Sequence, residues 1–205
     1  MVKYISLGCN CSVKEQLSRN GINDQTLPFD WIKIKDFDQV IRMISNNFSN
    51  FMDNLIFMKN DDEKKFFVEK DKTKKSQIYG NNIATFYHDF CCEEDYNTQY
   101  EINKEKYQRR IERFYNILKS DEKIIFIRND VHLKNVQHNI LIDFDKAVKK
   151  VNKNIDYHIK WIIHPSKNFD CNTINKINGS EIIVSYNKPI NWWQDEINWN
   201  EIFFS

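Results

Sequence analysis

The chain has 205 residues, the size of one domain, and a chain of this length buries about 70% of its unfolded surface, so its stability does not require disulfides. The 30 Lys and Arg against 29 Asp and Glu give a net charge of +1, which excludes the general positive field that attracts nucleic acid or anionic lipid. No apolar stretch reaches the roughly 18 residues of a membrane span, and no signal peptide is evident, so we expect a cytoplasmic protein.

Residues 3–7 form a short β-type run that ends at Gly8, and Val13 and Leu17 then follow at helical spacing until Gly21. This pattern predicts a strand, a tight loop and a helix. A second helix is predicted after Asp36, with an apolar face made by Phe37, Val40, Ile41 and Ile44.

Residues from about 50 to 86 have a less regular pattern. Two charged runs flank Phe66-Phe67-Val68, as charged turns flank the strand of a hairpin. We expect an exposed β-type insertion here.

The second half alternates between helical and strand patterns. It predicts helices at 104–119 and near 137–152, and strands at 123–128, 157–163 and 181–185. The tryptophan-rich tail, from Trp192 to Trp199, is expected to dock on the edge of the sheet. The whole pattern predicts a single α/β domain over residues 1–205, with a three-layer, Rossmann-like, largely parallel sheet and the insertion at about 50–86.

In such a sheet, ligands lie at the carboxyl ends of the strands, where Gly8–Cys11, Arg128–His132 and His164 all fall. Cys11 comes at the start of the first helix, where free N–H groups and the helix dipole favour a thiolate. Gly8 permits the tight turn, and the Asn10 side chain, with backbone N–H groups near Cys11, could bind an oxyanion.

A thiolate nucleophile needs a base, and His88 is the preferred candidate among five histidines because aromatic residues surround it and Asp89 follows it. His132 and His164 are rivals, whereas His138 and His158 look like surface or edge positions. Asp30, an acid among apolar neighbours, is expected either to orient the base or to fix the backbone.

Two further groups, one at the end of the 123–128 strand and one just after it, are candidate substrate contacts. Arg128 is expected to pair with Asp30 or Asp89 or to hold a substrate anion, and His132 could contact the substrate.

Cofactors and metals are not expected. The five cysteines lack the paired spacing of a zinc site, and Cys91-Cys92 with His88 is poorly spaced for tetrahedral coordination. Only 4 glycines are present, and no glycine-rich phosphate loop is found.

Several motifs occur together in chain order and carry a family resemblance: Ser6-Leu7-Gly8-Cys9-Asn10-Cys11, Pro28-Phe29-Asp30-Trp31, Phe86-Tyr87-His88-Asp89-Phe90, Tyr107–Phe114 and Phe126-Ile127-Arg128. With them the chain resembles the "putative papain-like cysteine peptidase" family, domain of unknown function 1796. The resemblance implies that Cys11 rather than Cys9 is the family cysteine, with His88 and either Asp89 or Asp30 as its partners. It also implies a bacterial or large-DNA-virus source, and host cytoplasm as the location if the chain is viral.

Three functions stay open at this point. The first is a cysteine hydrolase or acyl transferase acting on a peptide, an amide or another small substrate, with Cys11 attacking a carbonyl and His88 as base. The second is another α/β enzyme, such as an esterase or a glycosyltransferase-like enzyme, in which Cys11 only lines the pocket. The third is a non-catalytic binding or scaffold protein; the oligomeric state is not predicted.

Overall fold

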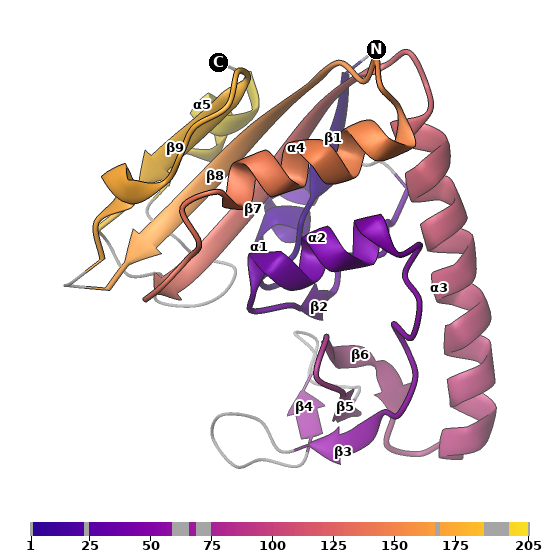
Figure 1. Ribbon diagram of the computed structural model, residues 1–205. Helices are drawn as coiled ribbons and strands as arrows, with labels where there is room; N and C mark the ends of the chain where they lie inside the picture. The colour runs from indigo at the N-terminus through magenta and orange to yellow at the C-terminus, as the bar shows by residue number, and fades with distance from the viewer. Residues whose placement is uncertain are drawn as a thin grey trace.

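A computed structural model of the chain describes residues 2–22, 25–58, 66–68, 75–166, 169–186 and 197–204 (Figure 1). These residues form a mixed α/β fold with two sheets. The first is parallel, with strand order β1-β7-β8-β9. Its strands are β1 (Val2–Ser6), β7 (Lys123–Leu133), β8 (Tyr157–Pro165) and β9 (Ser180–Val184). All four predicted core strands are therefore confirmed.

The parallel sheet is buried on both faces, which explains why its central strands read as continuous apolar runs. Phe126 and Trp161 point to one face and pack with helices α2 (Phe37–Ser45) and α4 (Ile140–Val151). Ile127 and Ile162 point to the other face and pack with α1 (Ser12–Arg19) and α5 (Trp199–Phe204).

The tail follows the prediction only in part. Trp199 begins α5 and packs on a face of the sheet, together with residues of β7 and β8, rather than on its edge. Trp192 and Trp193 lie outside the described residues.

The second sheet is antiparallel and contains the predicted insertion. Its strands are β2 (Ile32–Lys33), β3 (Ile56–Met58), β4 (Phe66–Val68), β5 (Lys75–Gly80) and β6 (Thr85–Cys91). The β-type character of the described part of residues 50–86, with its strand at 66–68, is confirmed. The sheet nevertheless extends to Cys91 and includes β2, and Phe86 and Phe90 on β6 are completely buried in the core. The sheet is thus not a peripheral appendage, and the three-layer, Rossmann-like arrangement is not confirmed.

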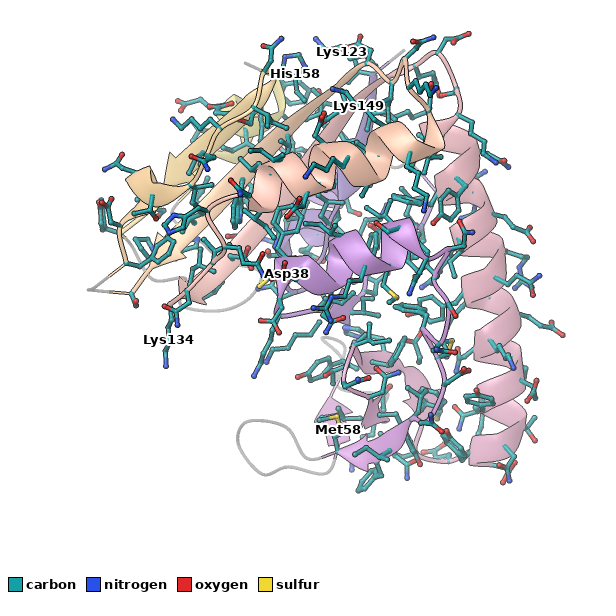
Figure 2. The ribbon with its side chains drawn as sticks, viewed as in Figure 1. Asp38, Met58, Lys123, Lys134, Lys149 and His158 are labelled. Carbon is teal, nitrogen blue, oxygen red and sulfur yellow. The ribbon has the colours of Figure 1, made fainter. Side chains whose placement is uncertain are left out.

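Gly80 shows how tightly this sheet is packed. A Cβ at this position would lie 2.5 Å from Met58 Sδ and 2.9 Å from the Ala84 carbonyl oxygen. Figure 2 labels Met58 among the side chains of the antiparallel sheet, far from Lys123 and His158 at the opposite end of the molecule.

Helix α3 (Tyr96–Leu118) joins the two sheets and runs alongside both in Figure 1. The prediction of a helix at 104–119 is confirmed, but the helix begins earlier, because the Asp95 carboxylate caps it by accepting from the Thr98 N–H at 2.9 Å. Tyr107, Phe114 and Leu118 form its buried face and belong to the same apolar cluster as Phe126 of the parallel sheet.

Candidate active site

The loop that follows β1 turns the chain sharply before α1 begins. Leu7 still donates to the Ile127 carbonyl at 2.9 Å, and the backbone then takes left-handed conformations at both Gly8 and Cys9, with φ of +74° and +72°. Such a φ costs a residue with a Cβ about 1–2 kcal/mol, so the strain is concentrated at Cys9. Cys11 then occupies the N-cap position of α1.

Asn10 holds the entry to this helix. Its Oδ1 accepts from the Ser12 N–H at 2.9 Å, which satisfies one of the N–H groups that a helix start leaves unpaired. The Asn10 amide is thereby held next to Cys11, with its Nδ2 group as a potential donor.

Cys11 and His88, which are 77 positions apart, meet in the structure. The Cys11 Sγ atom lies 3.7 Å from Nε2 of His88, within the range of a sulfur hydrogen bond, and Cys11 is only 7% exposed. The thiol also lies at the N-terminal end of α1, where the helix dipole stabilises a negative charge.

A bulge in β6 carries His88. Gln77 pairs with Phe90 and Tyr79 with Phe86, so three residues of β6, 87–89, lie opposite Ile78 alone on β5. Bulges of this kind redirect side chains and are common next to active sites. The buried rings of Phe86 and Phe90 anchor the strand on each side of the bulge.

Asp89 is bound by α3 through three contacts. Its carboxylate accepts from Lys106 Nζ at 2.6 Å and from the Tyr107 hydroxyl at 3.0 Å, and its backbone carbonyl accepts from the Asn103 amide at 2.6 Å. Burial and the Asp89 charge raise the pKa of Tyr107 well above its ordinary value, and a charge on Cys11 acts in the same direction. Tyr107 therefore lies within electrostatic reach of the Cys11 sulfur.

The Pro28-Phe29-Asp30-Trp31 motif places an aromatic ring against His88. Asp30 Oδ2 accepts from the Leu27 N–H at 2.8 Å, which closes the turn, and lies 3.6 Å from Lys14 Nζ on α1. The Trp31 ring then meets the imidazole edge-on, at a centroid distance of 5.9 Å and an angle of 76°. Burial raises the pKa of Asp30 to about 6, even though Lys14 opposes this shift.

Arg128 is completely buried and pairs with Asp130, two residues along the same strand. Its Nε and Nη2 donate to the two carboxylate oxygens at 2.6 and 2.7 Å, and Nη1 donates to the Leu7 carbonyl at 2.8 Å. The expected partners, Asp30 and Asp89, instead contact Lys14 and Lys106. Because Arg128 is enclosed and bonded to the end of β1, we expect it to support the Cys11 loop rather than to contact a substrate.

The remaining candidates lie in different surroundings. Cys9 is buried near Asp130, and burial together with the Asp130 charge raises its pKa to about 12, so it remains a neutral thiol. His164 is also buried, and its Nε2 contacts Asn129 Oδ1 at 3.1 Å. His158 is exposed, and the side chain of His132 lies outside what the structure describes.

Sequence reasoning missed the contribution of α3. Tyr107 was expected only on the apolar face of the helix, and Asn103 and Lys106 were given no role, since nothing in their spacing indicates that they bind Asp89 on a strand. Metal ligands were not expected, and in the described part of the chain no group of three His, Cys, Asp or Glu side chains could hold an ion.

Comparisons with known proteins agree with the motifs. A family model described as "Putative papain-like cysteine peptidase (DUF1796)" matches residues 2–168, which include every site residue named above. The chain is 30% identical to "Uncharacterized protein R408" of Acanthamoeba polyphaga mimivirus over 216 aligned positions, which cover 98% of this chain and 97% of the relative. No solved structure is significantly similar. Within the described residues, none of the helices has the length and apolar character needed to cross a membrane.

Proposed function

Because the chain belongs to the "putative papain-like cysteine peptidase" family, we propose that it is a cysteine-nucleophile hydrolase or acyl transferase acting on a peptide, an amide or a related acyl compound. One observation carries the proposal: the Cys11 Sγ atom lies 3.7 Å from His88 Nε2 at the start of a helix. A thiol, a base and a helix N-terminus in this arrangement favour a thiolate–imidazolium pair.

The proposed reaction has two halves. The Cys11 proton passes to His88 Nε2, the sulfur adds to the carbonyl carbon of the substrate, and the imidazolium returns the proton to the leaving amine or alcohol as the bond to carbon breaks. The product is a thioester on Cys11. Water, or another nucleophile in a transferase, then gives its proton to His88, attacks the thioester and releases the acyl group and the Cys11 thiol.

The negative oxygen that forms during each attack needs donors. We assign this role to the Asn10 Nδ2 group and to backbone N–H groups beside Cys11, because Asn10 is fixed through its Oδ1 contact with Ser12. Trp31 restricts the imidazole ring, and Asp89 holds the β6 bulge on α3, so both are proposed as positioning residues for His88. Asp30 is proposed to fix the turn that presents Trp31.

A hydrolysis screen with matched variants tests this function. A panel of fluorogenic peptides, simple amides and thioesters is expected to contain a substrate of the wild type. The kcat/KM for that substrate should fall by about 10²–10⁴-fold in His88→Ala. It should also be lost in Cys11→Ala and be unchanged in His158→Ala, because His158 is exposed and lies at the opposite end of the parallel sheet (Figure 2).

Turnover that survives Cys11→Ala would overturn the proposal. It would favour the alternative in which another group does the chemistry and Cys11 only lines the pocket.

A further inference from the structure

Arg110 on α3 has an unusual environment. Its guanidinium carbon lies 4.8 Å from the centroid of the Tyr107 ring, one helical turn earlier. Its Nη1 atom is buried and has no hydrogen-bond partner among the residues that the structure describes. A buried charged donor without an acceptor is costly, so such a group in a native protein requires an explanation.

The neighbouring arginines of the same helix are accounted for. Arg109 is exposed and lies 3.9 Å from Glu105, and Arg113 donates to the Thr26 carbonyl oxygen. The helix is therefore not simply rich in unpaired guanidinium groups. Arg110 differs from Arg109 in that its Nη1 atom faces the protein interior.

The carboxylates close to Arg110 are occupied by other groups. Asp89 accepts from Lys106 and Tyr107, and Asp30 accepts from the Leu27 N–H and pairs with Lys14. The charge of Arg110 acts on both Asp30 and the Tyr107 hydroxyl, so the guanidinium lies within electrostatic reach of both groups.

A short chain of contacts links Arg110 to the Cys11–His88 pair through Tyr107 and Asp89. Tyr107, on whose ring Arg110 stacks, contacts the carboxylate of Asp89, the residue that follows His88. Tyr107 also lies within electrostatic reach of Cys11. An anion bound by Arg110 would thus lie close to a carbonyl group under attack by Cys11.

We propose that Arg110 binds a carboxylate of the substrate beside Cys11, so that the enzyme acts on acidic acyl compounds, such as peptides with a carboxylate close to the scissile bond. The planar guanidinium can donate two parallel hydrogen bonds to a carboxylate. It can do so only with donors that the protein itself does not use, and in the described part of the chain Nη1 of Arg110 is such a donor. That the bound anion is part of a substrate rests on the proposed function. The existence of an anion site at Arg110 does not.

The test compares two alkylating reagents at Cys11, negatively charged iodoacetate and neutral iodoacetamide, with mass spectrometry to quantify the modified cysteine. In both reactions the sulfur displaces iodide, so the ratio of the two rates cancels the reactivity of the thiol. Arg110→Gln should lower the iodoacetate-to-iodoacetamide ratio about five- to tenfold, since it removes the charge that attracts the anion. Arg109→Gln should leave the ratio unchanged, and Arg110→Lys should retain part of it.

A second measurement needs no reactive thiol. N-acetylglutamate should raise the Tm of the wild type, of Cys11→Ala and of Arg109→Gln, should raise that of Arg110→Lys less, and should not raise that of Arg110→Gln. Neutral N-acetylglutamine should have no effect on any of them. If Cys11 is inert but this pattern of Tm shifts is observed, the anion site stands and the hydrolase proposal fails. The Arg110 assignment fails if the rate ratio does not change in Arg110→Gln and N-acetylglutamate does not stabilise the wild type. If alkylation of Cys11 still depends on His88 in that case, the hydrolase proposal stands.

Discussion

Cys9 and Cys11 are two residues apart and have opposite environments. Cys9 takes a left-handed conformation and points toward the buried Asp130, and its burial, together with the Asp130 charge, raises the pKa of its thiol, which stays protonated. Cys11 occupies the N-cap position of α1 and faces His88. The difference arises from the backbone turn at Gly8 and Cys9, which separates the two side chains. At the level of single residues, this turn is what makes one of the two thiols a candidate nucleophile.

Asp30 gives a prediction for stability against pH. Burial raises its pKa in the folded protein to about 6, above the ~3.9 of an exposed Asp, so the folded state binds this proton more tightly than the unfolded state does. The stability that the group contributes is therefore fully present below about pH 4 and is lost as the pH rises through about 6. Between these limits the loss is on the order of 2–3 kcal/mol.

Urea denaturation of the wild type and of Asp30→Asn, from pH 4 to pH 7, measures the contribution of Asp30 to stability. The free energy of unfolding of the wild type relative to the variant should fall across that range. Asp143→Asn, which changes a carboxylate on the exposed face of α4, should run parallel to the wild type. A wild type whose advantage over Asp30→Asn grows with pH would contradict the assignment.

Two elements cooperate to place His88. The β6 bulge turns the imidazole toward Cys11, and α3 holds the bulge through the contacts of Tyr107, Lys106 and Asn103 with Asp89. A bulge interrupts the hydrogen bonds of the strand ladder, so the contacts with α3 give β6 support that its pairing with β5 does not give there. We infer that α3 acts as a clamp for the base.

Tyr107→Phe tests this clamp. The variant keeps the ring but removes the hydroxyl that donates to Asp89, so we expect a loss of about 1–2 kcal/mol in stability and a slower reaction of Cys11 with iodoacetamide. Tyr100→Phe is the matched control, because its hydroxyl donates to the Met52 carbonyl from the same helix. Tyr100→Phe should lower stability without slowing the alkylation of Cys11. Equal alkylation rates in Tyr107→Phe and Tyr100→Phe would show that α3 does not position the base.

At the scale of the whole molecule, the site forms where the two sheets meet. Cys11 comes from the end of the parallel sheet, and His88 comes from the antiparallel sheet. Local patterns predicted the strands and helices of the parallel part well, because hydrophobic periodicity and cap residues are encoded over a few positions. They also identified Cys11 and His88 as a candidate pair.

What the sequence could not indicate depends on contacts between distant residues. Residues 50–86 were taken for an exposed insertion because of their charged runs, whereas Phe86 and Phe90 on β6 are completely buried. Arg128 was expected to pair with Asp30 or Asp89, whereas Asp130, its neighbour on one face of β7, is its partner. The role of Tyr107 requires α3 to pack on β6, which no pattern within the helix reveals.

The central claim is that His88 activates Cys11, and the pH dependence of iodoacetamide alkylation at Cys11, in the wild type and in His88→Ala, tests it most directly. We predict that the wild type reacts well below the ~8.5 at which a free thiol ionises, and that His88→Ala moves the midpoint of the profile upward. His158→Ala should follow the wild type. An inert Cys11, or a profile that does not change in His88→Ala, would contradict the account.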